Sequence, residues 1–137
     1  MKSISTLFIM MFFVVINTSC NGQTDKSENT TTKTAKAGAI NVYYFHYTHR
    51  CVTCMSVENV SKKAVSDLYG NNVSFASYNL EEAEGEAKGK ELGVSGQTLL
   101  IVSGDTKIDL TNEGFLNARS NPEKLKQIIK EKIDPLL

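Results

Sequence analysis

A pair of cysteines stands where a β-forming run gives way to a helical pattern, and this arrangement constrains the chain more than any other feature. The run from Ile40 to Tyr47 is rich in β-branched and aromatic residues, and Cys51 and Cys54 follow it just before the apolar spacing of a helix. The unpaired N–H groups at a helix N-terminus stabilise a thiolate. We therefore expect Cys51 to be the attacking thiol and Cys54, one helical turn further on, to be the resolving thiol.

Two side chains that can carry positive charge precede the pair. Arg50 and His49 stand directly before Cys51, and a neighbouring cation favours the thiolate over the thiol. We expect both residues to lower the pKa of Cys51.

Two other interpretations of the pair stay open. A permanent disulfide could staple the first helical turn, although so short a loop removes little chain entropy from the unfolded state. A Cu(I) or Zn(II) site could use Cys51 and Cys54 as thiolate ligands and His49 as a third ligand, with Met55 nearby. His46 alternates with its neighbours on the strand, which favours a packed side chain over a ligand.

The composition narrows the class of protein. The chain has 137 residues, enough for one domain with accessory segments, and its 15 basic and 15 acidic side chains leave no net charge. Nothing in this balance indicates a nucleic-acid partner. The third cysteine, Cys20, is far from the pair, which suggests a separate role.

The N-terminal residues have the layout of an export signal. Lys2 precedes an apolar run from Leu7 to Ile16 that is too short to span a bilayer as a helix. The small residues directly before Cys20 resemble the lipobox of bacterial lipoproteins, although Asn17 stands where that motif usually has leucine. We expect residues 1–19 to be a signal peptide and Cys20 to carry a lipid anchor in a bacterial envelope. The alternative is an ordinary signal peptide followed by an unmodified cysteine.

The segment after Cys20 is polar. Asn21 to Gly38 contains no large apolar side chain, so it cannot repay the entropy of becoming ordered. We expect residues 20–39 to be a flexible tether. The folded domain, residues 40–137, would then face the periplasm or the exterior of the cell.

Hydrophobic spacing predicts an α/β fold. The expected elements are a strand at Ile40–Tyr47, a helix up to Leu68, a strand at Val73–Asn79, a short helix at Leu80–Leu92, strands at Thr98–Ser103 and Thr106–Thr111, and a helix from Pro122 to Ile133. Val73–Asn79 is apolar on both faces, so we expect it to be a central strand. Gly85 and Gly89 weaken the prediction of the short helix. The result is a four-stranded mixed sheet flanked by helices on both faces.

From about Ile40 to Ile133 the chain resembles a thioredoxin-like domain, in which a Cys-x-x-Cys pair follows the first core strand. The segment from Tyr43 to Cys54 is most similar to small thioredoxin-like lipoproteins labelled the nitrophenyl compound nitroreductase subunit (ArsF) family, a label that implies electron transfer. The resemblance implies the same attacking and resolving roles for the two cysteines. The substrate loop is implied at Gly96, Gln97 and Thr98.

The chain departs from the thioredoxin-like pattern at three positions. Arg50 replaces a tryptophan, Phe45 replaces a buried acid, and Gln97 replaces the cis-proline that contacts the disulfide and receives the substrate backbone. Because a cis bond before a residue other than proline costs about 3 kcal/mol, we expect a trans peptide before Gln97 and a loop of different shape. In the family that proline also keeps metals from the thiols, so metal binding stays open as an alternative.

The sequence thus predicts an envelope-anchored thiol-disulfide oxidoreductase without a cofactor. Its expected partners are protein thiols or disulfides, or a reductase. Positive charge near Cys51 predicts a disulfide more oxidising than that of thioredoxin, because a stabilised thiolate favours the reduced form. The alternatives are a protein that binds and shuttles copper or zinc, and a non-catalytic subunit of a reductase complex.

Overall fold

The structure is a computed structural model that describes residues 39–137. Its elements are β1 (Ile40–His46), α1 (Val52–Tyr69), β2 (Val73–Asn79), α2 (Ala83–Leu92), β3 (Thr98–Ser103), β4 (Thr106–Asp109), α3 (Thr111–Asn117), α4 (Pro122–Ile133) and the short 3-10 helix η1 (Asp134–Leu136). The signal peptide predicted at 1–19, the lipid predicted on Cys20 and the tether up to residue 38 lie outside the described residues. Within residues 39–137, no helix combines the length and the apolar character needed to cross a membrane.

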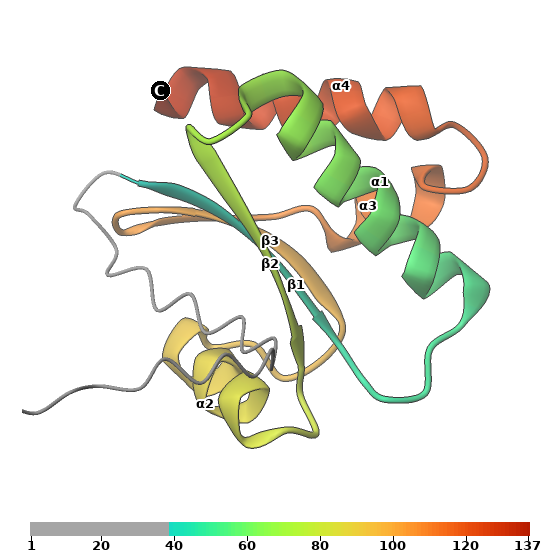
Figure 1. Cartoon of the computed structure of the whole chain (residues 1–137), viewed down its shortest axis with the longest axis vertical. Coiled ribbons are helices and arrows are strands. Elements are labelled where there is room, and N and C mark those ends of the chain that lie inside the picture. Colours follow the sequence, from blue (N-terminus) through green and yellow to red (C-terminus); the bar gives the residue numbers. More distant parts are fainter. Residues whose placement is uncertain (1–38) are drawn as a thin grey trace, which may run out of the picture. The chain divides into compact units, whose positions relative to one another are not determined.

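The four strands form one mixed sheet in the order β2-β1-β3-β4 (Figure 1). β1 runs parallel to β2 and antiparallel to β3, and β4 pairs with β3 as a hairpin. Tyr44 in β1 stands opposite Ser77 of β2 and Leu99 of β3. The parallel pair requires a crossover connection, which α1 supplies. The predicted four-stranded mixed sheet is confirmed.

β2 is an edge strand, so the predicted central position of Val73–Asn79 is wrong. Val73 is buried and the other residues of the strand are half-buried. Both α1 and α2 contact β2, and they lie on opposite faces of the sheet (Figure 1). Apolar residues on both sides of this strand therefore reflect two covered faces rather than two neighbouring strands.

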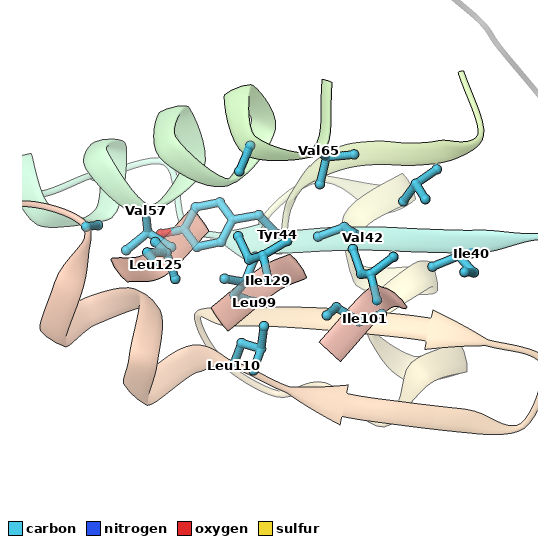
Figure 2. Close-up of a cluster of buried hydrophobic side chains, with 14 residues drawn as sticks. Ile40, Val42, Tyr44, Val57, Val65, Leu99, Ile101, Leu110, Leu125 and Ile129 are labelled. Carbon is cyan, nitrogen blue, oxygen red and sulfur yellow. The ribbon is translucent and has the colours of Figure 1, made fainter. Parts of the chain in front are cut away.

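The larger core lies between the sheet and the helices α1 and α4 (Figure 2). Val42 and Tyr44 alternate along β1 with residues of the other face, and both are fully buried. Leu99 of β3 and Leu125 and Ile129 of α4 are fully buried in the same cluster. This packing fixes the direction of β1, whose C-terminal end leads to the cysteine pair.

The opposite face of the sheet is covered by α2. Lys88 of this helix places its Nζ 5.5 Å from the ring centroid of Tyr43 on β1. Gly85 and Gly89 weakened the helix prediction, yet both are sites of close approach. A Cβ on Gly85 would lie 1.9 Å from the carbonyl oxygen of Asn79. Glycine therefore allows α2 to pack directly against the backbone at the end of β2.

The predicted strand Thr106–Thr111 is too long, because β4 ends at Asp109 and Thr111 begins the unpredicted helix α3. The Asp109 carboxylate accepts a hydrogen bond from the backbone N–H of Thr111 at 2.8 Å. Gly114 of α3 is buried, and a Cβ there would lie 3.1 Å from Cγ1 of Val57 in α1. Packing against α1 thus stabilises a helix too short to be stable alone.

Candidate redox site

Cys51 and Cys54 form a disulfide across the first turn of α1, with their Cα atoms 5.1 Å apart. Cys51 is the N-cap residue, and its sulfur accepts a hydrogen bond from the backbone N–H of Cys54 at 3.1 Å. Cys51 is exposed, whereas Cys54 is only 3% exposed. A sulfur from another molecule can therefore reach Cys51 but not Cys54.

The start of α1 favours negative charge on the Cys51 sulfur. The helix has 18 residues and no acidic side chain in its first turn. Its aligned peptide dipoles place partial positive charge at the N-terminus, where the N–H of Cys54 already points at the sulfur. This environment suits an attacking thiol.

Arg50, which was expected to tune Cys51, forms an ion pair with Glu58 of α1. Its Cζ also lies 5.9 Å from the ring centroid of Tyr44. Burial works against ionisation of Glu58, but the nearby Ser77 hydroxyl and the Arg50 guanidinium together lower the pKa of this carboxyl below its ordinary value. Because the two charges compensate each other, Arg50 favours a Cys51 thiolate less than an unpaired arginine would.

His49, the second residue expected to tune Cys51, is exposed on the loop before α1. Glu81 accepts a hydrogen bond from the backbone N–H of Thr48 at 2.7 Å. Hydrogen bonds from Thr48, with a smaller contribution from the charge of His49, lower the pKa of Glu81. Each basic side chain of the loop before the cysteines thus has an acidic side chain close to it: Glu58 lies beside Arg50, and Glu81 lies near His49.

Among residues 39–137, no three His, Cys, Asp or Glu side chains come together as a metal-binding group. Nδ1 of His46 lies 3.0 Å from the carbonyl oxygen of Tyr47. A disulfide offers no thiolate to a metal, since ligation requires reduced cysteines. The copper or zinc alternative, with Cys51, Cys54 and His49 as ligands, therefore concerns the reduced protein and stays a prediction.

The predicted substrate loop lies against the disulfide at the start of β3. Oε1 of Gln97 is 3.4 Å from Sγ of Cys54. The Thr98 hydroxyl donates a hydrogen bond to the carbonyl of Gly96 at 3.0 Å, which links the residues on either side of Gln97. No cis peptide bond occurs between residues 39 and 137, so the trans bond expected before Gln97 is confirmed.

A polar cluster beside the cysteine pair was not predicted. Glu58 pairs with Arg50 and lies near the Ser77 hydroxyl, and in the described part of the chain the Tyr44 hydroxyl and the Nε of Arg50 are buried without a hydrogen-bond partner. The sequence offered one signal for the position of Glu58, because this residue follows Cys54 by about one helical turn and therefore lies on the same face of α1. The pairing with Arg50 depends on how the intervening loop folds.

Exposed apolar side chains flank the accessible sulfur. Val52 and Met55, in the first turn of α1, are 60% and 43% exposed. Tyr47, which follows β1, is also exposed. Three large apolar side chains within four residues of Cys51 are therefore accessible to solvent.

No family model matches the chain, and a search of curated proteins found no match. Among solved structures, oxidised thioredoxin O2 from Arabidopsis thaliana is similar over 69% of this chain and 75% of that one, with 20% identity and a TM-score of 0.50. A malarial protein is similar over 65% of this chain and 96% of its own, with 16% identity and a TM-score of 0.46. A thioredoxin from Thermus thermophilus is similar over 72% and 80%, with 20% identity and a TM-score of 0.37. The likeness to the plant thioredoxin, together with the mixed sheet and its flanking helices, shows that this chain has a thioredoxin-like α/β fold.

Proposed function

We propose that this protein is a thiol-disulfide oxidoreductase whose redox centre is the Cys51–Cys54 pair. The observation that carries the proposal is the contrast between Cys51, an exposed residue at the helix N-cap, and Cys54, a residue that is 3% exposed. An attacking sulfur has to be reachable, and a resolving sulfur has to be shielded from competing partners and yet adjacent to the first. A thioredoxin-like fold with a disulfide at its first strand-to-helix junction supports the same assignment.

In the reducing direction, the Cys51 thiolate attacks one sulfur of a partner disulfide, and the other partner sulfur leaves as a thiolate. This step produces a mixed disulfide between Cys51 and the partner. The Cys54 thiolate then attacks the Cys51 sulfur, forms the intramolecular disulfide and releases the second partner thiolate. The partner gains two electrons and this protein loses two. The oxidising direction is the reverse of the same steps.

The disulfide is proposed to be more oxidising than that of thioredoxin. The N-cap position of Cys51 stabilises a thiolate and with it the reduced form. The contribution of Arg50 is reduced by Glu58. Equilibration with glutathione measures the reduction potential, and a value at or below about −270 mV, that of thioredoxin, would contradict this proposal.

The lipid anchor is also part of the proposal. The apolar run from Leu7 to Ile16 and the small residues before Cys20 support an exported, acylated chain in a bacterial envelope, with residues 20–39 as its tether. Envelope compartments are oxidising, which suits a chain with a disulfide. Cys20→Ser should move the protein from the membrane fraction to the soluble fraction. Retention of this variant on membranes would rule out acylation as the anchor.

The activity is tested with the full-length chain carrying Cys20→Ser, in which Cys51 and Cys54 are the two remaining thiols. We expect it to accelerate the reduction of insulin by dithiothreitol, and Cys51→Ser to return the rate to that of dithiothreitol alone. Acceleration that persists without Cys51 would show that the pair is not the redox centre.

Two alternatives use the same residues. The reduced chain could carry copper or zinc on Cys51, Cys54 and His49, and the replacement of a metal-excluding proline by Gln97 is the observation that favours testing this. The chain could also serve as a non-catalytic subunit of a reductase complex, as the narrower family resemblance implies. Stoichiometric copper or zinc on the reduced chain, without turnover that depends on Cys51, would favour the carrier.

A further inference from the structure

A carboxamide side chain lies against the buried sulfur of the redox pair. Oε1 of Gln97 is 3.4 Å from Sγ of Cys54, and Gln97 itself is half-buried. Cys54 is 3% exposed, so water has little access to its sulfur. A charge that develops on this sulfur therefore depends on protein groups for its stabilisation.

The Gln97 carboxamide can form a hydrogen bond with the Cys54 sulfur both as a thiol and as a thiolate. In the disulfide, Sγ of Cys54 carries no hydrogen, so the contact with Gln97 is not a thiol hydrogen bond. A carboxamide has an acceptor oxygen and a donor NH₂ group, which exchange places by half a turn about the last side-chain bond. Towards a thiolate it presents Nε2–H, and towards a thiol it presents Oε1.

The loop holds Gln97 in place from both sides. The Tyr47 hydroxyl donates a hydrogen bond to the carbonyl of Ser95 at 3.2 Å. The Thr98 hydroxyl donates to the carbonyl of Gly96 at 3.0 Å. These two bonds fix the loop backbone beside Gln97, so half a turn about the last side-chain bond is the movement that brings Nε2–H to the Cys54 sulfur as charge develops.

We propose that Gln97 is a catalytic residue that stabilises the Cys54 thiolate during thiol-disulfide exchange, an inference that rests on the proposed function. When a partner thiolate attacks Cys51, a new S–S bond forms at the Cys51 sulfur. The bond between Cys51 and Cys54 breaks, and its electron pair stays on the Cys54 sulfur. Nε2–H of Gln97 donates a hydrogen bond to this leaving sulfur. In the reverse step, the same contact keeps Cys54 ionised until it attacks.

The test compares Gln97→Met with the unmodified residue, both in the chain carrying Cys20→Ser. Methionine fills a similar volume but has no N–H donor. We expect the reduction of the Cys51–Cys54 disulfide by dithiothreitol to slow about tenfold, the low end of what a hydrogen bond to a charged group contributes. With Cys51→Ser added, the ultraviolet absorbance of the Cys54 thiolate should show its ionisation midpoint raised by about one pH unit.

A matched control separates this effect from a general loss of carboxamide groups. Gln127 is exposed on α4, where its amide donates a hydrogen bond to Glu131 at 2.9 Å, so Gln127→Met should change neither measurement. Gln97→Glu places a carboxylate against Cys54 and should raise the ionisation midpoint further than methionine does. The charged and titratable groups described beside the pair, Arg50, Glu58, His49 and Glu81, are the same in every variant.

The outcomes distinguish this inference from the proposed function. Gln97→Met with both a reduction rate and a Cys54 ionisation midpoint close to those of the unmodified chain would overturn the role of Gln97, even if insulin reduction proceeds. Failure of the unmodified chain to reduce insulin would overturn the proposed function. The Cys54 titration would then still report whether the carboxamide stabilises the thiolate.

Discussion

The outer and inner sides of the cysteine pair have opposite surroundings. On the outer side, Cys51 is exposed and adjoins Val52 and Met55, two exposed apolar side chains. On the inner side, Cys54 is 3% exposed and meets the carboxamide of Gln97. If the pair exchanges disulfides as proposed, the two sides have different roles. The surroundings of Cys51 affect which partner can approach, and the surroundings of Cys54 affect how easily the Cys51–Cys54 bond breaks.

Helix geometry produces this contrast from a short stretch of sequence. Cys51 caps α1, and Cys54 follows after one turn, on the face that continues to the fully buried Val57. The stretch leads directly from β1, which lies between two other strands and cannot shift without disrupting the core. The surroundings of each sulfur are therefore set by the fold.

The largest effect is expected when each sulfur is removed in turn. Cys54→Ser keeps the exposed thiol but cannot resolve a mixed disulfide, so an adduct should accumulate with glutathione disulfide. Cys51→Ser leaves a buried thiol, and its adduct should form at least about a hundredfold more slowly. Mass spectrometry of the two variants, both with Cys20→Ser, measures the difference. Equal rates of adduct formation would mean that the two sulfurs are equally accessible.

The second-largest effect concerns the ion pair between Arg50 and Glu58, which lies beside the cysteine pair. Glu58→Gln leaves the Arg50 guanidinium half-buried without its carboxylate; the two side chains are 22% exposed for Arg50 and 20% for Glu58. We expect the free energy of unfolding to fall by about 1–3 kcal/mol, below the loss of about 3–5 kcal/mol for a fully buried pair, because solvent screens part of the interaction. Urea unfolding measures this change. Glu86→Gln, which breaks an exposed pair with Lys90, is the control and should leave the midpoint in place. If the two variants have the same urea midpoint of unfolding, the Arg50–Glu58 pair contributes no more to stability than the exposed Lys90–Glu86 pair.

The same ion pair predicts a pH dependence. The Ser77 hydroxyl and Arg50 outweigh burial and hold the pKa of Glu58 below its ordinary value of 4.5, so the unfolded chain binds this proton more tightly than the folded one. The stabilisation is therefore fully present above the unfolded pKa and is lost as the pH falls through the folded pKa. The difference in unfolding free energy between the unmodified chain and Glu58→Gln should be largest near neutral pH and should shrink below about pH 4.5. If the difference in unfolding free energy stays constant as the pH falls, the loss in Glu58→Gln comes from altered packing and not from the charge of Glu58.

Local patterns predicted much of the fold because they depend on neighbouring residues. The predicted strands Val73–Asn79 and Thr98–Ser103 have the bounds of β2 and β3. The helix predicted up to Leu68 ends at Tyr69, with Gly70 as its C-cap at a positive φ of 55°. The order of the strands depends on pairing between distant segments, which is why β2 was misplaced. α3 was missed for a similar reason, because its packing against α1 is not visible in the run from Thr106 to Thr111.

The candidate site divides in the same way. The sequence predicted the roles of Cys51 and Cys54 from their spacing and their place before a helix, and these roles stay a prediction. The structure adds that Cys51 is exposed and that Cys54 is 3% exposed. The contact of Cys54 with Gln97 joins residues 43 positions apart, and the ion pair of Arg50 with Glu58 crosses from a loop to a helix. Both contacts require the folded backbone, so neither could be derived from residue types alone.

The smallest effect is expected from the apolar side chains on the outer side. Val52→Ser and Met55→Ser each remove exposed apolar surface beside Cys51, which a protein partner covers and a small disulfide does not. We expect each variant to raise the KM for insulin about two- to fivefold and to leave the reaction with glutathione disulfide unchanged. Leu137→Ser is the control, because this residue is 72% exposed at the C-terminus, at the other end of the domain from the start of α1 (Figure 1). If insulin and glutathione disulfide respond equally, these side chains act on the Cys51 sulfur itself, and the outer side is not a surface that selects partners.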